Sequence, residues 1–203
     1  MSFIDKCNDI FSTSVKDYHL TDNVDTPAPN PYPADSIEHI LYQKNWIDTI
    51  QWHLEDIIRD PHIEPSAALA IKRRIDRSNQ ERTDIVEQID TYFLEQYKHT
   101  SVRPDARINT ESPAWALDRL SILHVKLWHM SEQVSRTDVS TEHHERCCAK
   151  LAVLKEQLHD LSTSVTQLLE DYSNGTRVMK VYRQMKMYND PTLNPVLYQT
   201  TAK

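Results

Sequence analysis

Gly175 is the only glycine among the 203 residues of this chain, and this scarcity limits the folds open to it. Sheets with tight hairpins usually need glycine at their turns, because glycine adopts positive φ without steric cost. The ten prolines fall mostly outside the stretches with helical periodicity. The sequence therefore predicts an all-α fold, and it excludes the glycine-rich loops that cradle phosphate groups.

Apolar residues recur at spacings of three and four along five long stretches, which is the pattern of amphipathic helices. A short turn between the second and third stretches requires these two helices to fold back on each other. We expect an antiparallel up-and-down helical bundle of four long helices, with an additional N-terminal helix and a short C-terminal helix. The expected helices cover about 3–18, 35–60, 65–98, 113–134, 140–173 and 177–188.

Two features divide the chain into segments. Four prolines at alternate positions from Pro27 to Pro33 cannot continue a helix and indicate an extended linker. After Gly175, which marks a helix end, an apolar face runs from Val178 to Met185 and should be covered by the bundle. We expect an N-terminal helix (1–19), a proline-rich linker (20–34), a four-helix bundle core (35–175), and a C-terminal helix and extended tail packed on the bundle (176–203).

Composition and charge exclude several classes of protein. The formal net charge of −7 argues against nucleic-acid binding, because a phosphate-backbone binder needs a basic face. No apolar run approaches the roughly 20 residues that span a bilayer. The three cysteines, including the adjacent pair Cys147 and Cys148, do not form a secreted disulfide framework. A cytoplasmic protein with reduced thiols is expected.

The stretch from Ile75 to Ile89 places polar residues on a helix face that should be apolar. Ser78 and Arg82 share this face with the two isoleucines, because helical residues three and four apart point the same way. Burying an arginine is costly unless a carboxylate and further hydrogen bonds meet it. Arg82 therefore indicates either a polar network or a binding site inside the bundle.

A polar layer in the middle of the bundle follows from counting residues away from the turn near His62. The second, third and fourth helices then bring their polar side chains to a common depth. One interpretation is a site for an anionic small molecule, in which Lys44 and Arg82 hold a phosphate. The other is a salt-bridge network that fixes helix register. The candidate ligand-binding residues are Lys44, Asn45, Asp48, Asp76, Asn79, Arg82, His129 and Glu132.

The histidines suggest a second kind of site. His39, Trp46 and His53 recur every seven residues beside the core face of the second helix. Together with a histidine of the fourth helix they could form a three-histidine metal site, as in some helical-bundle hydrolases. Hydrogen-bonded packing of half-buried histidines is the alternative. The weak candidates for metal ligands are His53, Asp56, His124 and His129, and the sequence assigns neither a metal nor a cofactor.

Two His/Cys pairs lie on the expected fifth helix. His143 with Cys147, and His144 with Cys148, have the four-residue spacing that can hold zinc from one helix. Two more ligands would be needed, and no comparable spacing nearby offers them. Cys147 also fits the apolar seam of this helix, so packing is the preferred interpretation.

Two segments carry a resemblance to a known family: DSIEHILYQKNWIDTIQWHLEDIIRDP (35–61) and ALAIKRRIDRSNQERTDIVEQID (68–90). With the motifs KNWID, WHLED and IDRSNQERTD they resemble an uncharacterised bacterial all-helical family, domain of unknown function 4254. The resemblance implies an all-helical cytoplasmic protein whose relatives are often encoded among glycosyltransferases of cell-surface glycans. Glycan-assembly proteins are therefore candidate partners. The resemblance brings no catalytic role for any residue.

Three functions remain in view at this point. The first is a cytoplasmic bundle protein that binds a sugar nucleotide or phosphosugar at the polar layer, accessory to cell-surface glycan biosynthesis. The second is a non-catalytic interaction or scaffold protein whose polar layer only sets helix register. The third is a metal-dependent hydrolase of helical-bundle type. The sequence leaves open whether the chain is an enzyme and whether it forms a homo-oligomer.

Overall fold

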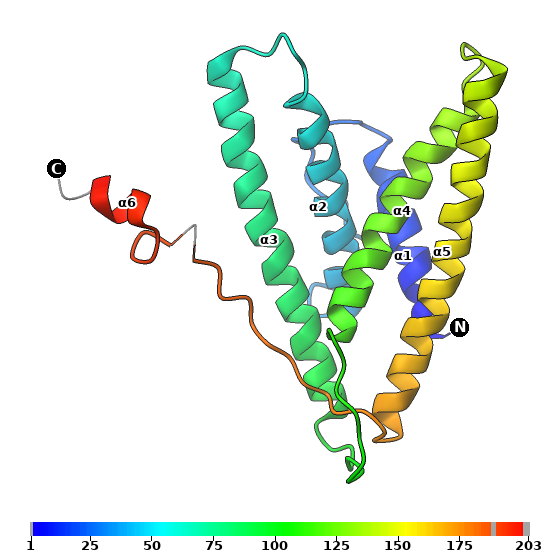
Figure 1. Cartoon of the computed structure of the whole chain (residues 1–203), viewed down its shortest axis with the longest axis vertical. Coiled ribbons are helices and arrows are strands. Elements are labelled where there is room, and N and C mark those ends of the chain that lie inside the picture. Colours follow the sequence, from blue (N-terminus) through cyan, green and yellow to red (C-terminus); the bar gives the residue numbers. More distant parts are fainter. Residues whose placement is uncertain (1, 188–189, 201–203) are drawn as a thin grey trace.

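The computed structural model describes residues 2–187 and 190–200 (Figure 1). The described part of the chain is all-α and contains no strand, as the sequence predicted. Among its helices, none is both long and apolar enough to cross a membrane. The helices are α1 (Phe3–Tyr18), α2 (Ile37–Ile57), α3 (Pro65–Tyr97), α4 (Pro113–Ser135), α5 (Thr141–Ser173) and α6 (Pro195–Thr200).

The four long helices form two hairpins. A short connection joins α2 to α3, and another joins α4 to α5. In Figure 1 the C-terminal ends of α3 and α5 lie close together at the bottom, and the two helices spread apart toward the top. α1 packs against α2 and α4 and touches α5, while α3 packs against α2 and α4. The side chains of α2, α3 and α4 therefore meet in the middle of the molecule.

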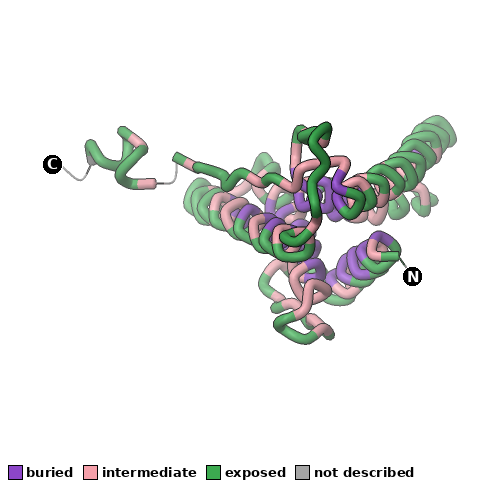
Figure 2. Tube along the Cα trace, turned by 90° about the horizontal axis from the view of Figure 1, so that it is seen from below, coloured by how far each residue is buried: buried purple, intermediate pink, exposed green. Residues whose placement is uncertain are grey.

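The N-terminal helix is part of the core rather than an addition to it. Cys7, Phe11 and Tyr18 of α1 are fully buried, because their spacing builds one apolar face that packs against α2 and α4. In Figure 2 the buried residues gather where the helices face one another, and the tail is exposed. The expected division into a helix 1–19 and a core 35–175 therefore separates segments that share one hydrophobic core.

A serine side chain caps the start of α2. Ser36 is the N-cap, and its hydroxyl accepts a hydrogen bond from the backbone N–H of His39 at 3.1 Å. Ser36 begins the helix because its side chain reaches an N–H group that has no partner within the helix.

The apolar seam of α5 is only partly buried. Only Cys147, Val165 and Tyr172 of its described residues are buried, whereas Leu151, Leu154 and Leu158 keep intermediate exposure. α5 packs mainly on α4 and touches α1 only slightly, so it has a close neighbour along one side. The apolar seam seen in the sequence is therefore less deeply buried than its composition suggested.

The short C-terminal helix lies further along the chain than predicted. Residues 177–187 are not helical, the expected residue 188 lies outside the described part, and α6 begins at Pro195. The backbone N–H of Arg107 donates to Thr176 O at 3.0 Å, and that of Val178 donates to Arg107 O at 2.9 Å. These bonds form an isolated parallel bridge and hold the chain extended after α5. The apolar spacing that predicted a helix leaves Met185 exposed.

Polar side chains, rather than the predicted apolar face, hold the tail on α3. Arg183 Nη1 donates to Glu87 O at 2.8 Å, and its Nη2 donates to Thr91 Oγ1 at 2.9 Å. Further along, Lys186 Nζ donates to Asn79 O at 3.0 Å and to Thr83 Oγ1 at 2.5 Å. The segment up to residue 187 therefore crosses α3 beside the middle of the bundle.

Candidate functional site

A buried lysine lies at the centre of the bundle. The Lys44 side chain is fully buried, and its Nζ donates a hydrogen bond to Asp48 Oδ2, one turn along α2. The same ammonium lies 2.8 Å from Oδ1 of Asp118 on α4. A buried ammonium is stable only with such partners, because removing the charge from water is costly. The lysine therefore ties α2 to α4.

Arg82 of α3 completes this group of charges. Its Nε lies 2.5 Å from Asp48 Oδ1, and its Nη2 lies 3.3 Å from Asp118 Oδ1. Burial disfavours the charged form, yet Asp48 and Asp118 raise the pKa of the Arg82 guanidinium above its ordinary value. Two cations and two carboxylates from three helices thus balance one another. We call Lys44, Asp48, Arg82 and Asp118 the charge cluster.

Neutral side chains satisfy the remaining hydrogen-bonding groups of Asp48. Ser121 Oγ donates to Asp48 Oδ2 at 2.6 Å, and Asn45 Nδ2 donates to Ser121 Oγ at 3.0 Å. Ser121, Asn45 and Lys44 are fully buried. The charge cluster and these two residues therefore fix the register of α2, α3 and α4, as expected of a register network.

Five of the eight candidate ligand-binding residues meet here. Lys44, Asn45, Asp48 and Arg82 belong to the network, and Asn79 Oδ1 accepts from Arg82 Nη1 at 3.5 Å. The other three are elsewhere: the Asp76 carboxylate pairs with Lys72 on the exposed side of α3, and Glu132 Oε2 lies 2.9 Å from His129 Nδ1.

Counting residues failed for α4 because of the preceding loop. If a short turn joined α3 to α4, residues equally far from that turn would face each other, and the region of Trp128 would lie beside Arg82. The structure instead places Asp118 there. In Figure 1 the loop 98–112 returns along the bundle before α4 begins, so α4 starts deeper than assumed. The offset is about ten residues, or roughly 15 Å of helix. Asp118 and Ser121 were missed for this reason, although a polar Asp118 among apolar neighbours was a usable signal.

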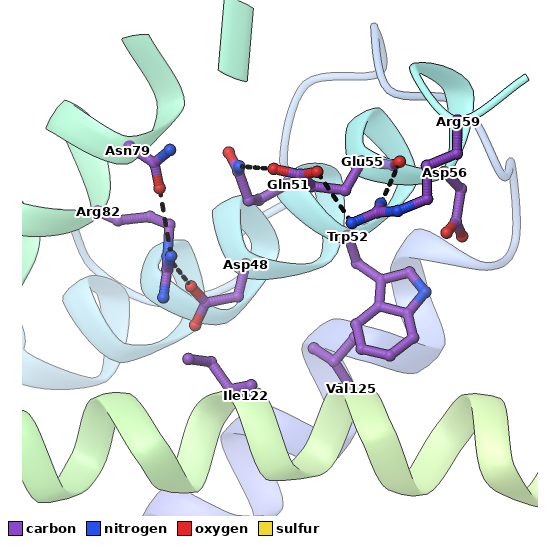
Figure 3. A pocket seen from close by; sticks show the side chains of 10 residues that line it. All are labelled: Asp48, Gln51, Trp52, Glu55, Asp56, Arg59, Asn79, Arg82, Ile122 and Val125. Carbon is purple, nitrogen blue, oxygen red and sulfur yellow. Dashed lines mark hydrogen bonds and ion pairs between the residues drawn. The ribbon is translucent and has the colours of Figure 1, made fainter. Parts of the chain in front are cut away.

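A pocket of about 430 Å³ opens beside Arg82, and we call it the Arg82 pocket. In Figure 3, Arg82 and Asn79 approach Asp48 from α3, and α4 closes another side of the pocket with Ile122 and Val125. The charge cluster, with Asn45 and Ser121, is thus paired toward the middle of the bundle. On the side of Arg82 that faces away from the middle, it borders a cavity. The pocket is lined by Asp48, Gln51, Trp52, Glu55, Asp56, Arg59, Asn79, Arg82, Ile122 and Val125.

The tail borders a second cavity, of about 330 Å³, on another side of Arg82. Gln184 and Lys186 line it together with Asp118 and Trp115. Burial lowers the pKa of Lys186, whose ammonium bonds to α3 rather than to the charge cluster. Arg82 therefore separates two cavities, of which the one lined by Trp52 is the larger.

Three histidines form a separate cluster near one end of α1. A ring nitrogen of each of His19, His53 and His129 lies within 4.8 Å of a ring nitrogen of the other two. Burial lowers the pKa of His53, and the neighbouring His129 and His19 lower it further. The neutral imidazole is therefore the favoured form of His53. We call these three residues the histidine cluster.

The four candidate metal ligands do not lie together in the structure. His53 and His129 join the histidine cluster, whereas Asp56 lines the Arg82 pocket. His124 lies apart, with its Nε2 3.0 Å from Asn8 Oδ1 of α1. The third member, His19, was missed because it follows the last residue of α1, outside the helical periodicity.

Burial of His124 predicts a pH dependence of stability. Burial lowers the pKa of His124 to about 4, from 6.5 for the exposed side chain. The unfolded chain therefore binds a proton at higher pH than the folded one, so stability should fall as pH drops from 6.5 to 4, by on the order of 3 kcal/mol. His124→Gln should flatten this part of the pH profile in urea unfolding, and exposed His62→Gln should not. Equal profiles for wild type and His124→Gln would contradict the assignment.

The cysteine pairs of α5 do not gather further ligands. Cys147 is buried with its Sγ 3.4 Å from His143 Nε2, and Cys148 Sγ lies 3.8 Å from His144 Nδ1. Among the described residues, only the histidine cluster brings three such ligand groups together. Packing remains the preferred role of Cys147.

Comparison with known proteins agrees with the two segments that carried the family resemblance. None of the curated proteins and none of the solved structures compared with the chain matches it. The family described as "Protein of unknown function (DUF4254)" matches residues 38–181, which is more than half of the chain. That range begins within α2, ends before Arg183 and Lys186 of the tail, and includes the charge cluster, whereas His19 precedes it. The chain therefore belongs to the DUF4254 family.

Proposed function

We propose that this protein binds a phosphorylated sugar, of the class that includes phosphosugars and sugar nucleotides, in the Arg82 pocket. The observation that carries the proposal is a pocket of about 430 Å³ in which an indole, two amides, three carboxylates and two guanidinium groups converge. Its size lies within the range of about 300–1,000 Å³ for small-molecule sites.

The lining suits the parts of such a ligand. Trp52 offers an apolar ring surface on which the C–H face of a sugar can pack. The carboxylates of Glu55 and Asp56 accept hydrogen bonds from hydroxyl groups, and the amides of Gln51 and Asn79 both donate and accept them. A ligand rich in hydroxyl groups matches this mixture of donors and acceptors.

The two arginines are the groups available to a phosphate. Arg82 uses three of its five N–H donors in hydrogen bonds to Asp48, Asn79 and Asp118, which leaves two for a ligand. Arg59 is well exposed at the rim, where it pairs with Glu55. Lys44 was expected to share this role, but its ammonium is enclosed by Asp48 and Asp118.

The charges that line the pocket restrict which class of ligand can bind there. Three carboxylates, those of Asp48, Glu55 and Asp56, face two guanidinium groups, so the pocket carries no excess of positive charge. Such a site favours a ligand with few phosphates and many hydroxyls over a polyphosphate. This preference fits an accessory role in cell-surface glycan assembly, which the family resemblance led us to expect.

The competing function is that of a non-catalytic interaction protein. The complete pairing of the charge cluster supports a register role for its inner side, and such a network needs no ligand. A binding role additionally requires the pocket side chains to contribute to affinity, and this difference can be measured.

Calorimetric titration with UDP-glucose, glucose 1-phosphate and glucose tests the proposal. The two phosphorylated compounds should bind more tightly than glucose. Arg59→Ala should weaken their binding about tenfold or more, because a hydrogen bond to a charged group contributes about 1.5–3 kcal/mol. Arg119→Ala is the matched control, since both side chains are 66% exposed and each pairs with a glutamate, but Arg119 lies outside the pocket.

Two results would contradict the binding role. One is the absence of any heat or melting shift with all three compounds at millimolar concentration. The other is equal binding by the Arg59 and Arg119 variants. Either result would favour the register network as the function of the polar layer.

A further inference from the structure

The histidine cluster brings together ligand groups from three helices. His19 follows the last residue of α1, His53 is on α2 and His129 is on α4, and their facing ring nitrogens lie within 4.8 Å of one another. α1, α2 and α4 pack on each other, so the histidines sit where rigid elements meet. Sites on rigid helices hold their ligands in place better than sites on loops.

The hydrogen bonds of the rings indicate which nitrogens are available. His19 Nδ1 lies 2.7 Å from the carbonyl oxygen of Val15, and His129 Nδ1 lies 2.9 Å from Glu132 Oε2. A carbonyl or carboxylate acceptor keeps the proton on Nδ1 and leaves the Nε2 lone pair for another partner. An outer acceptor behind a ligating histidine, as seen here for His19 and His129, is typical of metal sites.

The Nε2 atoms of all three histidines are buried, and none makes a hydrogen bond within the described chain. The Asp22 carboxylate is 3.8 Å from His19 Nε2, which is too far for a hydrogen bond. A buried nitrogen without a partner costs free energy, and three such atoms in one place cost more. A metal ion satisfies all three lone pairs at once.

Aromatic rings hold each imidazole in position. Trp128 stacks on His19 at 4.5 Å between centroids, Trp52 stacks on His129 at 4.9 Å, and Tyr18 stacks on His53 at 4.9 Å. These rings form an apolar shell around the nitrogens, which strengthens coordination by limiting water. Packing alone accounts for the stacking but not for the convergence of three unpaired nitrogens.

We propose that His19, His53 and His129 bind a divalent transition-metal ion such as zinc. Neutral imidazole is a preferred zinc ligand, with Zn–N distances of about 2.0–2.1 Å and hence roughly 3.3 Å between ligand nitrogens. The three ring nitrogens already lie within 4.8 Å of one another, and small movements of the imidazole rings bring them to that spacing. Three protein ligands leave a fourth position, and Asp22 places a carboxylate beside it.

Metal titration of the full chain tests this proposal. The background carries Cys147→Ser and Cys148→Ser, because the His/Cys pairs of α5 are a second place where zinc could bind. We expect one equivalent of Zn²⁺ by calorimetry. Co²⁺ should also quench tryptophan fluorescence, because two of the four tryptophans stack on cluster histidines.

The variants separate ligation from folding. His53→Gln should weaken binding at least 100-fold. His124 is a partly buried histidine outside the cluster, so His124→Gln should leave binding unchanged. Glu132 is half exposed, so Glu132→Gln should fold normally and weaken binding about tenfold, as expected for an outer acceptor of a metal-bound histidine. Circular dichroism checks that each variant remains helical.

Two outcomes would overturn the proposal. One is the absence of Zn²⁺ and Co²⁺ binding by the background chain up to millimolar concentration. The other is a His53→Gln chain that stays helical and binds as tightly as its parent. The sugar-phosphate pocket is tested by other variants, so either proposal can fail without the other.

Discussion

Replacing Lys44 by methionine should lower the free energy of unfolding by about 3–5 kcal/mol, because it leaves two buried carboxylates with one cation between them. Methionine has nearly the length of lysine, so the change removes the charge with little change in volume. Asp48 would keep Arg82 and Ser121, whereas Asp118 would keep only the 3.3 Å contact with Arg82. The loss of charge balance, rather than a cavity, is the expected cause.

Urea unfolding followed by circular dichroism measures this effect, and a double variant identifies its cause. Lys44→Met combined with Asp118→Asn removes one cation and one carboxylate, so the remaining charges of Asp48 and Arg82 balance each other. This double variant should recover more than half of the lost stability. Lys72→Met removes an exposed lysine that pairs with Asp76 and should cost less than about 1 kcal/mol. A double variant less stable than Lys44→Met alone would contradict the explanation.

Replacing Gly175 by alanine should cost about 3 kcal/mol, from two separate effects. Gly175 has a φ of 67°, which a residue with a side chain adopts only with strain. A Cβ atom there would also overlap the carbonyl oxygen of Ser101, in a loop tied to this position by the 2.9 Å hydrogen bond from Arg103 N to Gly175 O. The loop must move, and the end of α5 loses its contact with it.

Two further substitutions at this junction separate strain from overlap. Asparagine tolerates positive φ but still has a Cβ, so Gly175→Asn should be nearly as destabilising as alanine if overlap dominates. The neighbouring Asn174 has an ordinary φ of −84°, and Asn174→Ala should stay within about 0.5 kcal/mol of wild type. A Gly175→Ala chain within 1 kcal/mol of wild type in urea unfolding would refute the prediction.

Local signals in the sequence were sufficient to predict the five long helices, α1 to α5. The start of α3 at Pro65, the start of α4 at Pro113 and the end of α5 before Gly175 are marked by proline and glycine chemistry that acts within a few residues. The same holds for Arg82, whose place on an apolar stripe required partners inside the bundle. Its meeting with Asp48 follows from the α2–α3 hairpin, because a short turn fixes relative depth.

Features that depend on longer connections could not be predicted in this way. The depth of Asp118 depends on the path of the loop 98–112, which periodicity does not describe. The extended path after Gly175 depends on backbone bonds to Arg107, seventy residues earlier in the chain. His19 joins the histidine cluster because α1 packs against both α2 and α4. Each of these depends on tertiary contacts between distant segments rather than on local sequence.

The charge cluster makes the charge balance of the α2–α3 hairpin depend on α4. Lys44 and Asp48 are one turn apart on α2, and Arg82 of α3 reaches Asp48 across a separation of 34 residues. Without α4 these three side chains would carry one unbalanced positive charge, which would have to stay in contact with water. Docking of α4 brings Asp118 and removes this excess. The α4–α5 hairpin therefore supplies the carboxylate that neutralises the α2–α3 hairpin, and Lys44 can be fully buried only when the two hairpins are packed together.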